Sequence, residues 1–203
     1  MNTYIIVYPI PTKLKKLIKI NEDDKVIVVD KAFIDYSKLN LKIDLVIGDF
    51  DSIPSYKSLL KEYETIKFSS LKDYSDTYLA VKYAKEKGFN NIQIIGGLGG
   101  SRVDHTYANL LILNKYNDVT ILNNETKIRY LKKGVHLITF KGYISLFADD
   151  SAIITLKGFK YDLKDFKLKK DNPIGLSNEL INSQGEIIIK KGSIYLIETN
   201  YDK

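Results

Sequence analysis

The order of apolar runs along the chain constrains its fold more than any other feature. Up to residue 125, short apolar runs alternate with stretches of helical character, whereas from residue 126 onward short runs are punctuated by glycine. The first pattern is typical of a parallel sheet covered by helices, and the second of an antiparallel sandwich or barrel. The sequence therefore predicts an α/β fold: an N-terminal, mostly parallel sheet flanked by helices in residues 1–125, followed by a C-terminal all-β sandwich or barrel in residues 126–203.

Local patterns place the individual elements. Strands in the first part are expected at 4–8, 25–29, 45–48, 65–68, 91–95 and 119–122, and helices at 12–20, 54–63, 75–87 and from about residue 104. Strands in the second part are expected at 127–131, 135–140, 143–147, 152–156, 186–189 and 193–198.

Two aspartates with one residue between them, Asp49 and Asp51, follow the predicted strand at 45–48. On extended chain their side chains point the same way, with α-carbons about 6–7 Å apart. Carboxylates so close repel each other unless a cation lies between them, and their hard oxygens suit Mg²⁺. Ligands of open α/β sheets bind beyond the carboxyl ends of the strands. The pair therefore fits a magnesium site, although an acidic turn before the next helix explains this pattern equally simply.

Three further acids lie at the ends of predicted elements. Asp30 directly follows the strand at 25–29, and Asp76 lies on the inward face at the start of the helix at 75–87. Each fits either a helix cap or a ligand-binding side chain, because a carboxylate at a helix N-terminus gains from the helix dipole in both cases. Asp73, just outside that helix, is an alternative cap.

A glycine-rich loop follows the predicted strand at 91–95. Gly96, Gly97, Gly99 and Gly100 allow the backbone to approach a ligand closely, and the helix that follows offers free N–H groups to an anion. Glycine alone also marks flexible turns. The group Arg102, Asp104 and His105 at the helix start is harder to explain by packing, because the chain has only two arginines.

In the second part, Ser177 and Asn178 carry neutral donors and acceptors that suit an uncharged heterocycle, and a turn with a helix cap is the alternative. The composition narrows the function further. The net charge of +6 comes mostly from lysines that are interleaved with acids, whereas nucleic-acid sites usually show basic clusters rich in arginine. The chain lacks cysteine and any apolar run near the ~20 residues of a membrane span. We expect a cytoplasmic protein that binds neither nucleic acid nor membranes.

Six segments, taken together and in this order, resemble thiamine pyrophosphokinases. They span residues 44–180 and read Gly48-Asp-Phe-Asp-Ser52, Lys72-Asp-Tyr-Ser-Asp76, Gly96-Gly-Leu-Gly-Gly-Ser-Arg-Val-Asp-His105 with Asn109, Ile144-Ser-Leu-Phe147, Gly158-Phe-Lys-Tyr-Asp-Leu163 and Pro173-Ile-Gly-Leu-Ser-Asn-Glu179. The resemblance implies a homodimer that transfers the pyrophosphoryl group of ATP to the hydroxyl of thiamine, with AMP as the second product. It also implies that residues 1–125 are the catalytic domain, which binds ATP and Mg²⁺, and that residues 126–203 bind thiamine and form the dimer.

The resemblance also assigns site residues. It implies Mg²⁺ ligands at Asp49, Asp51 and Asp76, and further catalytic side chains at Asp73, Arg102 and Asp104. It implies nucleotide contacts at Asp30, Lys72, Gly97, Gly99, Gly100 and His105. On the thiamine side it implies Ser177 and Asn178, in a segment close to the catalytic domain of the partner subunit.

The chain departs from the family pattern in several places, which include Ser75-Asp76 for the usual Thr-Asp pair and an extra residue, Ser101, before Arg102. The loops after the first two strands read Tyr8-Pro-Ile-Pro11 and Asp30-Lys-Ala-Phe33, where the family usually has glycine. Some members stack a tryptophan on thiamine, and because this chain has none, a tyrosine or phenylalanine has to take that place.

Three other functions are compatible with parts of the pattern. A pyrophosphokinase with another acceptor, such as a hydroxymethylpterin, would share the acidic and glycine segments, but the segment at 177–179 favours thiamine. A nucleotide-binding protein without activity would have no reason to keep several mutually repelling carboxylates. A basic nucleic-acid-binding module is the third alternative, and a steep salt dependence of affinity would support it.

Overall fold

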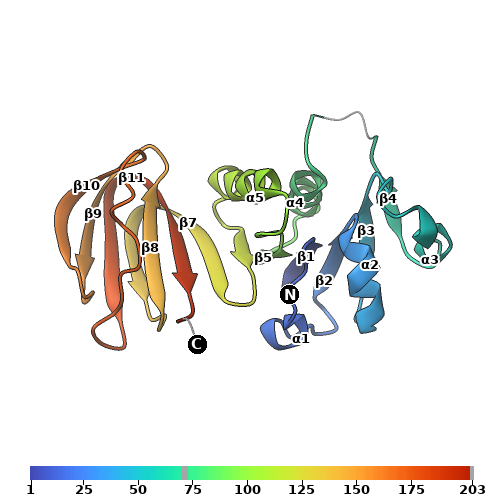
Figure 1. Cartoon of the computed structure of the whole chain (residues 1–203), viewed down its shortest axis with the longest axis horizontal. Helices are drawn as coiled ribbons and strands as arrows, with labels where there is room; N and C mark the ends of the chain where they lie inside the picture. Colours follow the sequence, from blue (N-terminus) through green and yellow to red (C-terminus); the bar gives the residue numbers. More distant parts are fainter. Residues whose placement is uncertain (70–72, 202–203) are drawn as a thin grey trace. The chain divides into compact units, whose positions relative to one another are not determined.

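The computed structural model describes residues 1–69 and 73–201, and the chain divides into two compact units, Met1–Asn124 and Glu125–Lys203 (Figure 1). The described part of the first unit contains a parallel sheet with the order β6-β5-β1-β2-β3-β4. Its strands are β1 (Thr3–Val7), β2 (Lys25–Val29), β3 (Leu45–Gly48), β4 (Thr65–Lys67), β5 (Ile92–Gly96) and β6 (Thr120–Leu122). Strands β1, β2 and β3 are buried along almost their whole length, as strands covered on both faces are.

Helices cover both faces of this sheet. One face packs against α1 (Leu14–Leu17) and α2 (Ala32–Tyr36), and the other against α4 (Asp76–Glu86) with α5 (Val103–Lys115) beside it (Figure 1). The remaining helical segments are η1 (Ser37–Leu39), η2 (Pro54–Tyr56) and α3 (Lys57–Leu60). Helix α4 begins where the Ser75 hydroxyl accepts a hydrogen bond from Tyr78 N–H at 3.2 Å, and it ends before Gly88, whose φ is +71°. Ser75, not Asp73, is therefore the cap.

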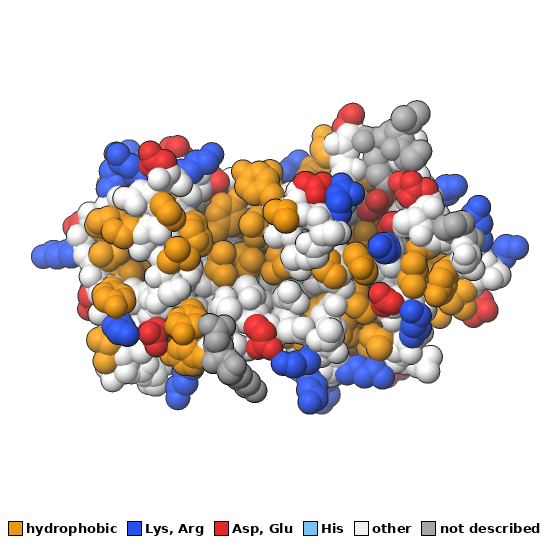
Figure 2. Space-filling model, viewed as in Figure 1, with side chains coloured by type: hydrophobic (Ala, Val, Ile, Leu, Met, Phe, Trp, Pro, Cys, Tyr) orange, Lys and Arg blue, Asp and Glu red, His pale blue; other side chains and the backbone are white. Residues whose placement is uncertain are grey.

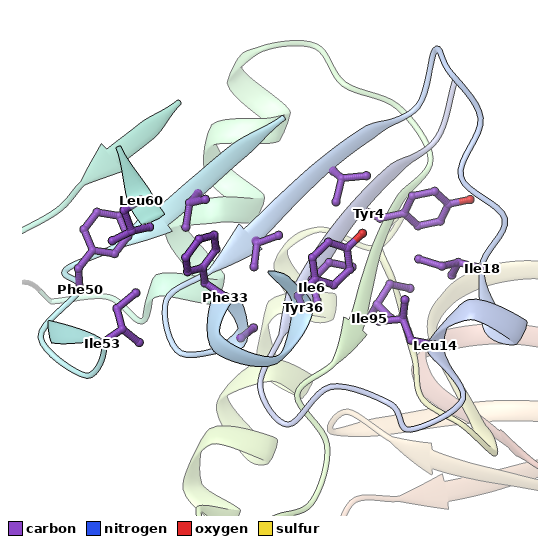
Figure 3. Close-up of a cluster of buried hydrophobic side chains, with 14 residues drawn as sticks. Tyr4, Ile6, Leu14, Ile18, Phe33, Tyr36, Phe50, Ile53, Leu60 and Ile95 are labelled. Carbon is purple, nitrogen blue, oxygen red and sulfur yellow. The ribbon is translucent and has the colours of Figure 1, made fainter. Parts of the chain in front are cut away.

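The core on the α1 and α2 face explains how a short helix is held. Phe33 and Tyr36 of α2 point into the sheet against Ile6 and its neighbours (Figure 3). Both aromatic side chains are fully buried. Phe50, which follows β3, lies in the same cluster. This burial stabilises a five-residue helix whose length alone would not.

The second unit is antiparallel throughout its described strands. These are β7 (Thr126–Ile138), β8 (Tyr143–Ala148), β9 (Ser151–Lys157), β10 (Leu163–Lys169) and β11 (Gly185–Thr199). The long strand β11 pairs with β7 along its whole length, with β9 through its first part and with β8 through its second. Every second side chain of β11 is buried, first Ile187 and Ile189 and then Ile194 and Leu196. A register shift separates the two pairs. One core therefore lies between the two halves of the bent strands.

Several elements differ from the local prediction. Strands expected separately at 127–131 and 135–140 form one strand, β7, and those at 186–189 and 193–198 form β11, because Gly134 and Gly192 are irregularities inside strands. The helix expected at 54–63 is reduced to η2 and α3. Strand β10 and helix α2 were not expected.

Charges of both signs are interspersed over the face of the molecule in view (Figure 2). Lysines and acids alternate there on both units, as their mixing in the sequence predicts. Within the described residues, no helix has the length and hydropathy needed to cross a membrane.

The buried carboxylate of Asp24 provides a test of how the first unit is tied together. It accepts hydrogen bonds from the N–H groups of Asn2 at 2.6 Å and Asn21 at 2.9 Å, and these bonds hold its pKa below the ordinary value of 3.8. A lowered pKa means that this stabilisation is present above pH 3.8 and is lost as the pH falls through the folded-state pKa.

We expect Asp24→Ala to lower the free energy of unfolding by about 2 kcal/mol at pH 7, with a smaller loss below pH 3. Urea unfolding at both pH values measures this difference. The exposed neighbour Asp23→Ala is the control and should be neutral. Equal stability of the two variants at pH 7 would contradict the assigned role of Asp24.

Candidate functional site

The strand order creates one crevice at the carboxyl end of the parallel sheet. Strand β1 is central, with β2 on one side and β5 on the other, so the chain leaves β1 and β5 in opposite directions. Such a switch point opens a crevice for ligands. A cavity of about 470 Å³ lies there, lined by residues that follow β1, β2, β3 and β5 and by the start of α4.

An acidic cluster forms one wall of this cavity. Carboxylate oxygens of Asp30, Asp49 and Asp51 all lie within 4.8 Å of one another. Asp30 follows β2, whereas the other two follow the neighbouring strand β3. Among the described residues, Asp76 lines the same cavity without belonging to this cluster.

The backbone around the cluster explains how three like charges are held together. The N–H of Asp30 donates to Ile47 O at 2.7 Å, which ties the ends of β2 and β3 together. A Cβ at Gly48 would lie 2.9 Å from the Asp30 Cβ, so glycine is needed at this close approach. Phe50 has a φ of +62° and its ring is buried in the core, so the chain turns between Asp49 and Asp51. The two carboxylates thus meet across a turn, not along an extended strand as the sequence suggested.

Electrostatics within the cluster favour a cation. Hydrogen bonding and repulsion from Asp49, followed by smaller effects that include Asp30, raise the pKa of Asp51. The Oδ1 atom of Asp30 is buried and has no hydrogen-bond partner among residues 1–69 and 73–201, while its Oδ2 accepts from the Ser52 hydroxyl at 2.7 Å. Clustered carboxylates with an unsatisfied buried oxygen fit a hard divalent ion such as Mg²⁺, which takes oxygen ligands.

The glycine loop forms the opposite wall. Gly97 N–H donates to Pro9 O at 3.2 Å, which ties this loop to the end of β1. The Asn109 side chain of α5 donates to Gly97 O at 2.8 Å, and the Gly99 N–H donates to the Thr106 hydroxyl at 2.9 Å. Because Gly97, Gly99 and Gly100 all have positive φ, the loop follows a path that other residues rarely adopt. The loop is therefore held at Gly97 and at Gly99.

Arg102 and Asp104 form a tight ion pair at the start of α5. Arg102 Nε lies 3.0 Å from Asp104 Oδ1, and Nη2 lies 2.6 Å from Oδ2. This contact lowers the pKa of Asp104 to about 2 and raises that of Arg102. Both side chains are mostly exposed, so the pair orients the guanidinium more than it stabilises the fold.

Most of the residues implied on the phosphate side lie on this one cavity. Its lining includes Asp30, Asp49, Asp51, Asp76, Gly97, Gly99, Gly100, Arg102 and His105. Asp104 contacts Arg102 from outside the lining, and Asp73 is exposed and outside it as well. Lys72 lies outside the described residues.

Ser177 and Asn178 belong to the second unit. Ser177 is exposed with a φ of +53°, whereas Asn178 is buried. The Asn178 amide accepts from the N–H of Tyr161 at 3.1 Å and donates to its carbonyl at 2.9 Å. This bidentate contact fixes the backbone of Tyr161, whose side chain is 62% exposed.

Tyr8 and Lys31 are among the lining residues that sequence reasoning missed. The Lys31 ammonium lies 4.4 Å from the centre of the Tyr8 ring. Tyr8 directly follows β1, and Lys31 comes after Asp30 at the end of β2, so the position at a strand end was the available signal. Tyr161 stood inside a recognised segment, but only the structure shows that it is exposed and that its backbone is bound by Asn178.

Fold and site together define a class of protein. An open α/β sheet with an acidic cluster and a glycine loop at its switch point is typical of transferases that act on phosphate groups. Comparison with known proteins narrows this class. The thiamin pyrophosphokinase catalytic domain matches residues 17–128, and the thiamin pyrophosphokinase vitamin B1 binding domain matches residues 125–194. The chain belongs to the thiamine pyrophosphokinase family, and is thus a transferase of the kinase type.

Individual relatives agree with this placement. The chain is 34% identical to the thiamine pyrophosphokinase of Bacillus subtilis, over 75% of this chain and 76% of the relative. The crystal structure of thiamine pyrophosphokinase from Bacillus subtilis superimposes with a TM-score of 0.84 at 29% identity, covering 98% of this chain and 99% of that one. A thiamin pyrophosphokinase structure from Geobacillus thermodenitrificans gives 0.86 at 24% identity, covering 98% of each chain. The predicted fold class is confirmed.

The glycine loop gives a prediction that separates backbone strain from crowding. Gly97 and Gly88 have nearly the same φ, +69° and +71°. A Cβ at Gly97 would lie 2.6 Å from the Asn109 Nδ2, whereas a Cβ at Gly88 would meet nothing within 4 Å. Only the first substitution displaces the amide that holds the loop.

We expect Gly88→Ala to lower the free energy of unfolding by about 1 kcal/mol through backbone strain alone. Gly97→Ala should cost about 2–3 kcal/mol and should also weaken nucleotide binding, because the loop shifts. Urea unfolding and calorimetric titration with ATP measure both effects. Equal losses of stability in the two variants would show that the contact with Asn109 does not hold the loop.

Proposed function

We propose that this chain transfers the pyrophosphoryl group of ATP to the hydroxyl of thiamine, giving thiamine diphosphate and AMP. The observation that carries the proposal is one cavity that combines the acidic cluster, the glycine loop and Arg102 within a chain of this family. Phosphoryl transfer is catalysed mainly by positioning and by neutralising charge, and these residues are suited to both. The cytoplasm remains the expected location.

The acidic cluster is the proposed Mg²⁺ site. Asp30, Asp49 and Asp51 would hold the ion, and Asp76 in the same cavity remains a candidate ligand. The sequence implied Asp30 as a nucleotide contact; we assign it to the metal instead, because its buried Oδ1 has no hydrogen-bond partner in the described part of the chain. When bound, Mg²⁺ would neutralise charge on phosphate oxygens.

The other polar residues have distinct proposed roles. The N–H groups of Gly97 and Gly99 are taken by Pro9 and Thr106, so the N–H groups that follow Gly99 and those at the start of α5 would bind phosphate oxygens. Arg102 would contact the transferred group, held in position by Asp104. A carboxylate with a pKa of about 2 has little affinity for a proton at neutral pH, so Asp104 is poorly suited to accept one from the thiamine hydroxyl. Asp76, which lines the cavity, is the remaining candidate for that task.

Tyr161 is the proposed aromatic partner of thiamine. Its ring is exposed and its backbone is clamped by Asn178, so the ring is presented rigidly. The thiazolium ring of thiamine is a cation, and cations bind well to aromatic faces. Asn178 would then act on thiamine through Tyr161, while the exposed Ser177 is free to contact the substrate directly.

A homodimer is also proposed. Val103, Tyr107 and Leu111 lie on one face of α5 at helical spacing and are 72%, 60% and 48% exposed. Such an apolar stripe on a surface helix is typical of an interface. Light scattering that gives the mass of a single chain at micromolar concentration would contradict this proposal.

The function is tested by AMP release from ATP and Mg²⁺, with and without thiamine, with mass identification of the products. We expect AMP and thiamine diphosphate to form in equal amounts only when thiamine is present. A folded protein that releases no thiamine-dependent AMP would overturn the proposal, and AMP release with a hydroxymethylpterin instead would support the alternative acceptor.

Asp51→Asn is the matched variant for this assay. It should lower kcat on the order of 100-fold, because a charged ligand is lost. Its stability without Mg²⁺ should not fall, since Asp51 is exposed and repelled by Asp49. Asp23→Asn, exposed and outside the cavity, is the control. An unchanged kcat in the folded Asp51→Asn variant would remove Asp51 from the mechanism.

Tyr161→Ala should raise KM for thiamine about tenfold and leave KM for ATP unchanged, because only the ring contact with thiamine is lost. Tyr161→Phe keeps the ring and should behave like the unmodified protein, and Tyr161→Leu should resemble the alanine variant. Steady-state kinetics with each substrate varied in turn measures these effects. A normal KM for thiamine in Tyr161→Ala would assign the contact to another residue.

A further inference from the structure

The charge balance of the cavity leaves one cation without an acidic partner. Its lining contains four aspartates and two permanent cations, Lys31 and Arg102. Arg102 is held by both oxygens of Asp104. Within residues 1–69 and 73–201, no carboxylate forms an ion pair with Lys31; its recorded partner is the ring of Tyr8. Lys31 is therefore the cation whose charge is least compensated.

The position of Lys31 is set by the sheet. Strands β1 and β2 pair in parallel with Ile6 opposite Val28, so Tyr8 and Lys31 emerge next to each other at the switch point. The residue after Tyr8, Pro9, accepts the hydrogen bond from Gly97 N–H. The ring of Tyr8 is 43% exposed and lines the cavity. It therefore holds the ammonium at the wall of the cavity that the acidic cluster and the glycine loop also line.

The chemistry of the contact favours an anionic ligand. A ring face attracts a cation without neutralising it, whereas a carboxylate would cancel its charge. The ammonium keeps three hydrogen-bond donors on a flexible chain and can turn toward a phosphate. A cavity with four acids otherwise repels ATP, which carries about four negative charges.

We propose that Lys31 binds the polyphosphate chain of the nucleotide and that Tyr8 is the residue that positions it. This inference rests on the proposed function, because it deepens the assignment of the same cavity. It concerns two residues at places where the sequence departs from the family pattern. The ligand recognised is a polyphosphate, and the nucleobase is not required for the contact.

Kinetics provide the first test. We expect Lys31→Gln to raise KM for ATP about tenfold and to leave KM for thiamine within twofold. Lys31→Arg should restore most of the affinity, because it retains the charge. Lys61→Gln, an exposed lysine outside the cavity, should have no effect. Tyr8→Phe keeps the ring and should be neutral, whereas Tyr8→Leu should raise KM for ATP about threefold.

Calorimetric titration with inorganic tripolyphosphate, at constant Mg²⁺, separates this inference from the proposed function because no thiamine is needed. Lys31→Gln should raise the dissociation constants for tripolyphosphate and for ATP by similar factors. Unchanged dissociation constants for both ligands in folded Lys31→Gln would overturn the proposal even if the enzyme makes thiamine diphosphate. If Tyr8→Leu weakens binding of ATP but not of tripolyphosphate, the Tyr8 ring stacks on the nucleobase and its positioning role is overturned.

Discussion

Repulsion among the carboxylates of Asp30, Asp49 and Asp51 is the constraint on which the organisation of the cavity depends. Three like charges whose oxygens lie within 4.8 Å of one another do not stay together unless the backbone fixes them. Two contacts fix the backbone here. The N–H of Asp30 donates to Ile47 O of β3, and the buried ring of Phe50 anchors the turn between Asp49 and Asp51. The stability of the sheet therefore maintains a cluster that is unfavourable by itself, as is common at functional sites.

The same sheet also sets the opposite wall. Parallel strands end at one edge, so the residues after β1, β2, β3 and β5 converge without any contact between their side chains being necessary. The glycine loop is then fixed by Pro9 and by the buried amide of Asn109. The same buried sheet thus positions both the acidic wall and the glycine-loop wall, and the polar residues of the cavity lie in the short segments that follow its strands.

Sequence reasoning succeeded where burial alone determines structure. The strands at 25–29 and 45–48 are continuous apolar runs, and the structure has β2 and β3 there with the same bounds. It failed where packing overrides local pattern: α2 has five residues and exists because Phe33 and Tyr36 are buried. Strand β10 carries a bulge at Asp165, whose positive φ breaks the alternation of apolar residues that a strand normally shows.

For the candidate site, the sequence likewise showed which residues stand out but not how they approach one another in space. Asp49 and Asp51 stand out because of their spacing, but their approach depends on the left-handed Phe50, which no spacing rule contains. The place of Asp30 in the acidic cluster depends on strand order, since β2 and β3 must be neighbours. Lys31 and Tyr8 are ordinary residues in sequence, and their contact arises only because β1 and β2 pair in parallel.

The two walls together explain why metal and nucleotide would bind as a unit in the proposed function. The cavity by itself is rich in acid, so it attracts a divalent cation and repels a free polyphosphate. A cation on the acidic cluster would reduce the negative charge of the cavity. Lys31, Arg102 and the loop N–H groups would then meet a polyphosphate whose charge the cation partly neutralises. The cation would relieve the repulsion among the carboxylates and compensate charge on the polyphosphate, so binding of either ligand would favour binding of the other.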